Sequence, residues 1–247
     1  MEKILPSMFK NLSPLIILGF FILNACGEAP KLVFKETDFT TEKNTLVEII
    51  IPIASGDVLV ADAINADVKN EVIKALQPVD GETIIMNSIE ESITAFNEEY
   101  NNFKTDFPEV SQPWEAQIDG EIMYQSPEII SMSITSYINT GGVQGNLNIS
   151  FLNYDARTGQ RIKNFELFKN IDEFKALAQG YFEEAVENKS NAFNPNSFEL
   201  PENIGYNENG IILLFNAYET APYASDIIGF VIPFEEANDY LNFDSTR

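Results

Sequence analysis

Residues 137–159 constrain the fold strongly, because two predicted turns flank a segment that has the length of one β-strand. Gly141 and Gly142 tolerate the positive φ angles of a tight turn, and Gly145 lets other groups approach the backbone closely. Over residues 147–154, side chains alternate between a largely apolar face and a second face, which predicts a half-buried strand. Connections this short join antiparallel strands, because a parallel pair needs a crossover of about a dozen residues.

The rest of the chain predicts helices on either side of these strands. Apolar residues at helical spacing alternate with strand-like runs that are rich in β-branched residues. In chain order we expect strand 46–53, helices 58–76 and 84–103, strands 114–124, 128–138, 145–154 and 160–165, helix 168–188, strands 211–218 and 227–232, and helix 234–241. Helices segregated from antiparallel strands define an α+β fold. We expect antiparallel sheets with helices packed on one side, in two closely associated subdomains.

The amino-terminal segment has the features of an export signal. Two lysines form a short basic region, and residues 15–23 form an apolar run that is too short to span a membrane. The run ends in Leu23-Asn24-Ala25-Cys26, which resembles a bacterial lipobox. We expect residues 1–25 to be a lipoprotein signal peptide and Cys26 to carry the lipid. An ordinary secretory signal with an unrelated cysteine is the alternative.

Lipidation predicts a protein of the cell envelope that is anchored to a membrane and faces outside the cytoplasm. Gly27 is not the aspartate that retains enterobacterial lipoproteins at the inner membrane. We therefore expect the outer membrane if the cell has two membranes. Residues 26–44 contain Pro30 and many polar residues, which predicts a tether, although Leu32-Val33-Phe34 could start a strand.

The composition excludes several kinds of chemistry. The chain has no histidine and a single cysteine, which removes the Ser-His and Cys-His nucleophiles and the usual zinc ligands. We predict no metal site and no cofactor. The net charge of −23 repels nucleic acid and anionic lipid, and it attracts basic proteins. A simpler interpretation is that the acidity only keeps an exported protein soluble.

Several motifs follow one another in a characteristic order in the carboxy-terminal half. They are Asn-Tyr-Asp-x-x-Thr-Gly at 153–159, Glu-Leu-Phe at 166–168, Tyr-Glu-Thr-Ala-Pro-Tyr-Ala at 218–224 and a strand that ends in Ile232-Pro233. This order resembles the RsiV-like domain (domain of unknown function 3298). The preceding part has a strand ending in Ile-Pro and an Ile64-Asn65 pair in a helix, and it is similar to the N-terminal domain of PdaC-type peptidoglycan deacetylases (domain of unknown function 4163).

The resemblance implies a PdaC-like domain at residues 45–110, extending into the first strands that follow, and an RsiV-like domain at residues 111–247. One relative is an anti-sigma factor whose exported part binds lysozyme, and others carry a separate deacetylase domain. This chain lacks the histidines that the metal site of such a domain requires. Family members often have Ala-His after the two glycines, where Val143 and Gln144 stand here.

The candidates for contact with a partner lie in two loops. They are Tyr137, Gly141, Gly142, Gln144, Asn146, Tyr218, Glu219 and Tyr223. Tyrosines in loops provide a large contact area at low entropic cost. The alternative is that the glycines only form a hairpin and the tyrosines only pack over the end of a sheet.

We expect a binding protein without catalysis of its own, which senses or binds a lysozyme-like protein or a cell-envelope glycan. One alternative is a carboxylate-dependent hydrolase of peptidoglycan or another glycan, for which Trp114 beside Glu115 and Asp119 would be a sugar platform. Paired acids are weak support, because 38 acidic residues produce such pairs by chance. A second alternative is a structural envelope protein.

Overall fold

The structure is a computed structural model. It describes residues 31–77, 85–110, 112–187, 198–217, 219 and 227–243. The predicted signal peptide, Cys26, Tyr218 and Tyr223 lie outside these residues.

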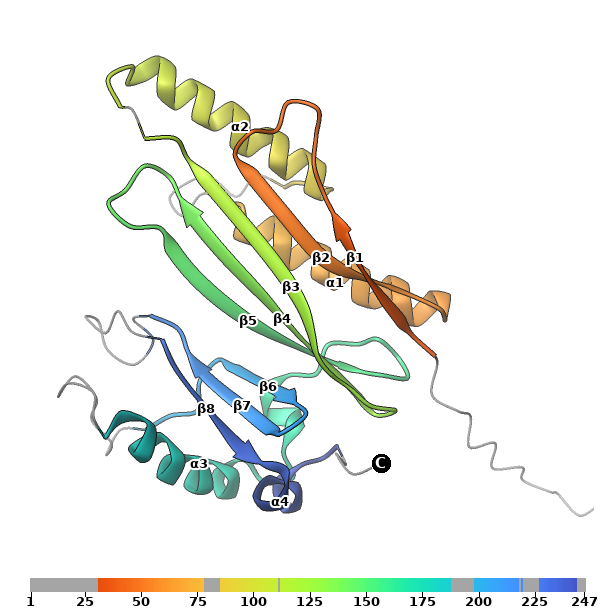
Figure 1. The fold of residues 1–247 in the computed structure, drawn as a ribbon. Coiled ribbons are helices and arrows are strands. Elements are labelled where there is room, and N and C mark those ends of the chain that lie inside the picture. Colours follow the sequence, from red (N-terminus) through yellow and green to blue (C-terminus); the bar gives the residue numbers. More distant parts are fainter. Residues whose placement is uncertain are drawn as a thin grey trace, which may run out of the picture.

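The first part of the chain builds a five-stranded sheet with the strand order β1-β2-β3-β4-β5 (Figure 1). Its strands are β1 (Val33–Asp38), β2 (Val47–Ser55), β3 (Glu115–Gln125), β4 (Ile129–Asn139) and β5 (Asn146–Asp155). All neighbours pair antiparallel except β2 and β3, which are parallel. A parallel pair needs a long crossover, and two helices between these strands provide it.

These two helices are α1 (Val58–Ala75) and α2 (Ile89–Asp106). Asp57 begins α1 by accepting hydrogen bonds from the amides of residues 59 and 60, and Ser88 caps α2 in the same way. The buried stripe of α1 packs with α2 on one face of the sheet. Its fully buried members include Ile64, Val68 and Val72, and they meet Ile49, Ile51 and Ile118 of the strands.

The second part of the chain forms a smaller sheet with the order β6-β7-β8. Its strands are β6 (Asn203–Asn207), β7 (Gly210–Phe215) and β8 (Ile228–Pro233). One face is covered by α3 (Ile171–Val186), with the short helices η1 (Asn164–Leu167), α4 (Phe234–Ala237) and η3 (Asn238–Tyr240) at its ends. The core between them is rich in phenylalanine, and the rings of Phe168 and Phe174 stack with centroids 4.0 Å apart.

The other face of the small sheet packs on part of the large one. Phe151 of β5 meets Ile212 and Leu214 of β7. Gly205 allows this approach, because a Cβ there would lie 2.9 Å from the Phe151 ring. The layers are therefore helices, large sheet, small sheet and helix. This is the α+β architecture with helices on one side of each sheet that the sequence predicts.

Asparagine side chains cover the free edge of β5. The Asn216 amide accepts from the backbone N–H of Ile149 (2.9 Å) and donates to its carbonyl oxygen (2.8 Å), as a neighbouring strand would. Asn203 accepts from the N–H of Phe151, and the buried Asn153 donates to the carbonyl of Ile204. These bonds prevent an edge strand from pairing with other chains, and they join the two subdomains.

The structure corrects several predicted elements. Residues 33–38, predicted as part of a tether, form strand β1 at the sheet edge. Residues 160–165, predicted as a strand, make only one isolated bridge at Arg161, because Glu166 accepts from the N–H of residue 163 and turns the chain into η1. The caps Ser88 and Asn170 delay the start of α2 and α3 to residues 89 and 171.

Candidate functional site

The predicted partner-binding residues of the first loop gather at the turn between β4 and β5. Tyr137 lies near the end of β4, and Asn146 begins β5. Gly141 has a φ of +89° and donates its N–H to the side chain of Asn139, so glycine is favoured there for conformational reasons. Gly145 is needed for a different reason, because a Cβ at this position would lie 2.3 Å from the Tyr137 ring.

Trp114 lies beneath this turn and is buried. Its ring packs against Phe96, Tyr100 and Phe103 of α2, with centroids 5.4–5.8 Å away. Its indole N–H has no hydrogen-bond partner in the described part of the chain, and a Cβ on Gly141 would lie 3.5 Å from this nitrogen. The ring is thus part of the core and does not present a face to a sugar.

The second loop comes close to the same half of β5. One oxygen of Glu219 accepts from the backbone N–H of Glu202, and the other accepts from that of Asn216, each at 2.8 Å. Asn216 in turn binds the backbone of Ile149, three residues after Asn146. The structure therefore brings the described residues of both loops to the first half of β5.

The strand register reveals a surface that the sequence analysis missed. On the side away from α1 and α2, side chains from four strands form two rows. One row is Glu48, Gln117, Tyr137 and Leu147, and the next is Ile50, Asp119, Thr135 and Ile149. The following row, from Glu121 through Ser133 to Phe151, runs under the small sheet at its Phe151 end. The second row also packs against the small sheet at its Ile149 end. We call these two rows, together with Glu115 and Glu121 at their ends, the open face.

The open face combines apolar groups with carboxylates. Leu147 is 41% exposed, and Ile50, Tyr137 and Ile149 are half-buried. The carboxylates of Glu48, Glu115, Asp119 and Glu121 are exposed, and none of them forms an ion pair within the described residues. Such a surface is suited to a partner that offers both apolar contacts and positive charge.

One signal in the sequence indicated this face in part. Polar residues occupy alternate positions from Glu115 to Glu121. Their neighbours on the face depend on the parallel pairing of β2 with β3, which no local pattern reveals.

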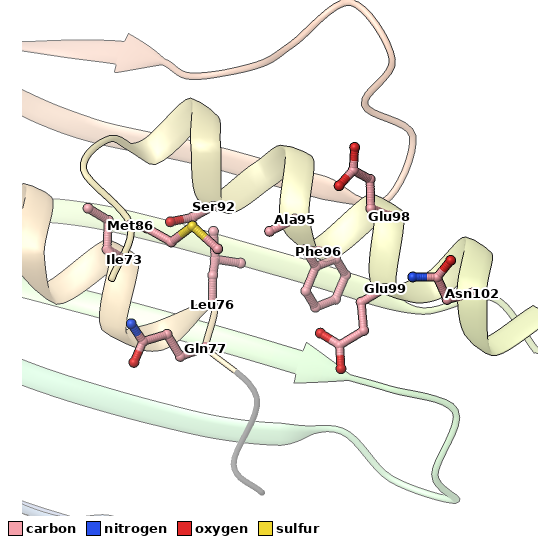
Figure 2. Close-up of a pocket in the computed structure, with 10 residues that line it drawn as sticks. All are labelled: Ile73, Leu76, Gln77, Met86, Ser92, Ala95, Phe96, Glu98, Glu99 and Asn102. Atoms are coloured by element: carbon pink, nitrogen blue, oxygen red, sulfur yellow. The ribbon is translucent and has the colours of Figure 1, made fainter. Parts of the chain in front are cut away.

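A cavity of about 370 Å³ lies between the end of α1 and residues 92–102 of α2 (Figure 2). Apolar side chains from both helices form its floor, and polar side chains stand at its rim. The lining residues are Ile73, Leu76, Gln77, Met86, Ser92, Ala95, Phe96, Glu98, Glu99 and Asn102.

A buried tyrosine connects the large sheet to α1. The Tyr154 hydroxyl donates to Asp67 at 2.9 Å, and Arg161 binds the same carboxylate oxygen at 2.9 Å. Burial raises the pKa of Tyr154, and the Asp67 charge raises it further. Because the group is enclosed and its partners satisfy it, we assign it a structural role.

Neither a candidate metal site nor a membrane-spanning helix is found among the described residues. They contain no group of three or more His, Cys, Asp and Glu side chains that could hold a metal ion. None of the helices described is long and apolar enough to cross a membrane.

The two sheets and their helices define a two-part α+β protein. Residues 39–147 match the family model described as "Deacetylase PdaC", and residues 163–235 match the one described as "Protein of unknown function (DUF3298)". The chain thus combines a PdaC domain with a DUF3298 domain, as the resemblance predicted. The second of these models describes a domain whose function is not known.

Two solved structures share the fold. A DUF3298 family protein from Bacteroides fragilis NCTC 9343 is 15% identical with a TM-score of 0.62, over 88% of this chain and 96% of that one. A DUF3298 family protein from Pseudomonas aeruginosa PAO1 is also 15% identical, with a TM-score of 0.58 over 86% and 94%. None of the curated proteins matches the chain. At this identity the likeness concerns the fold alone.

Proposed function

We propose that the protein is a lipid-anchored binding module of the cell envelope, without catalysis of its own, and that its open face binds a basic protein such as a lysozyme. The observation that carries the proposal is the set of four exposed carboxylates on β2 and β3, none of them in an ion pair within the described residues, beside the apolar side chains of Tyr137 and Leu147. The net charge of −23 adds a long-range attraction for a basic partner.

The anchor in this proposal is a lipid on Cys26, and the expected location is the outer membrane where the cell has two membranes. The lipobox-like motif supports the anchor. Replacing Cys26 by serine should move the protein from the membrane fraction to the soluble fraction and remove the mass of the lipid. Retention of the variant in the membrane fraction would contradict lipid anchoring.

The exposure of the carboxylates favours binding over glycan hydrolysis. A glycosidase needs one carboxylic acid that is shielded from water, so that it stays protonated at neutral pH. On the open face Glu48, Asp119 and Glu121 are all exposed. Exposed carboxylates are accessible to the Lys and Arg side chains of a protein partner.

Calorimetric titration with lysozyme tests the proposal, with an equally basic protein that has no muramidase activity as the comparison. The decisive variant carries Glu48→Gln, Asp119→Asn and Glu121→Gln. Three partly screened charge pairs at about 0.5 kcal/mol each predict a loss of about 1.5 kcal/mol, or about tenfold in Kd. Saturable binding should persist at physiological salt and be weaker in this variant.

The matched control removes the same charges elsewhere, by Asp62→Asn, Glu184→Gln and Glu208→Gln. These residues are exposed and lie on α1, on α3 and in the turn between β6 and β7. The control variant should bind as the unmodified protein does. Equal weakening in both variants, or equal binding of both basic proteins, would mean that net charge alone causes the attraction. Either result would contradict specific binding by the open face.

A further inference from the structure

The cavity between α1 and α2 lies away from the open face, on the side of the large sheet that carries the helices (Figures 1 and 2). Its apolar floor consists of Ile73 and Leu76 from α1 and its C-cap, together with Phe96 from α2. These three side chains also belong to the buried core of the large sheet, so the floor is held in place by packing on its far side.

The rim of the cavity is electronegative. Figure 2 shows the Glu99 carboxylate projecting from α2 on the side of the Phe96 ring that faces Gln77. Glu98 and Glu99 form no ion pair within the described part of the chain. Helix α1 ends at Ala75, so its macrodipole places partial negative charge at this end of the cavity. The carbonyl groups of Val72 and Lys74 accept hydrogen bonds from residues 76 and 77, and the exposed Lys74 is not among the lining residues.

An apolar floor under an electronegative rim selects an amphipathic cation. A neutral apolar molecule would gain binding energy only from the apolar floor, and an inorganic cation would gain it only from the acidic rim. An aromatic ring beside the rim also favours an organic cation, because the ring face attracts positive charge. The volume of about 370 Å³ is at the small end of the range for ligand sites.

We propose that this cavity is a binding site for a short alkylammonium ion. The alkyl chain lies over Ile73, Leu76 and Phe96, and the ammonium group lies between Glu99 and the carboxyl end of α1. This site is independent of the open face and of any protein partner.

Three probes of equal chain length test the proposal: hexylammonium, hexanol and hexanoate. Binding is followed by calorimetry and by the fluorescence of Trp114, the only tryptophan, whose ring centroid lies 5.6 Å from that of Phe96. Hexylammonium should bind about tenfold more tightly than hexanol, as expected for one or two partly exposed charge interactions. Hexanoate should bind most weakly.

Two variants locate the site. Glu99→Gln should reduce hexylammonium affinity to that of hexanol and leave hexanol binding unchanged. The control Asp62→Asn removes a negative charge near the start of α1, outside the cavity lining, and should change neither affinity. Ala95→Leu fills the cavity and should weaken all three probes. Equal affinity for hexylammonium and hexanol, or unchanged hexylammonium binding in Glu99→Gln or Ala95→Leu, would overturn the proposal.

Discussion

Replacing Tyr206 by phenylalanine should stabilise the protein. Tyr206 is fully buried beside Tyr124 and Phe234, and its hydroxyl has no hydrogen-bond partner among the described residues. Burial also raises the pKa of this hydroxyl. Leaving such a group unpaired costs about 1–3 kcal/mol, and removing it loses about 1 kcal/mol of packing. The expected net gain is about 1 kcal/mol in the free energy of unfolding.

The matched control is Tyr154→Phe, at a tyrosine that is equally buried but bonded. Its hydroxyl donates to Asp67 at 2.9 Å. Loss of a hydrogen bond to a charged group should destabilise this variant by about 1.5–3 kcal/mol. Urea denaturation with a common m value measures both differences. If Tyr206→Phe destabilises the protein by as much as Tyr154→Phe, the Tyr206 hydroxyl has a partner and the reasoning is wrong.

Three further predictions follow from single contacts. Gly145→Ala should displace the Tyr137 ring and weaken partner binding, while the melting temperature falls by only a few degrees because that ring is at the surface. Asn216→Ala should destabilise the protein by about 2 kcal/mol in urea denaturation, since two hydrogen bonds to the β5 backbone are lost. The hydrogen bond to Glu236 raises the pKa of Tyr181 to about 12, so the bond stabilises the fold below pH about 10. The difference in melting temperature between the protein and Tyr181→Phe should disappear as the pH rises through about 12.

Local patterns were sufficient to predict the antiparallel β3-β4-β5 unit and the existence of the main helices. Short connections dictate antiparallel pairing, and helical spacing of apolar residues survives in the buried stripes of α1 and α2. Strand β1 was predicted only as a possible start at residues 32–34, because most of its side chains are exposed and it is held by backbone pairing with β2. The polar residues 35–38 of this strand have no hydrophobic pattern that would indicate a strand.

The candidate site was predictable only in part. Glycines and tyrosines marked the turn between β4 and β5, because a turn has a local signature. The open face arises from the register of four strands, and Glu48 lies beside Gln117 only because β2 and β3 are parallel. Pairing between segments far apart in the chain leaves no trace in local periodicity.

Zero-length coupling of carboxylates to amines in the complex with lysozyme, followed by mass spectrometry, tests whether the open face binds the partner. It reports which acidic residues of the protein lie against lysines of the partner. If the open face binds lysozyme, cross-links should form at Glu48, Glu115, Asp119 and Glu121, with few on α2 and α3. Cross-links spread evenly over the exposed acids, or concentrated away from the open face, would contradict it.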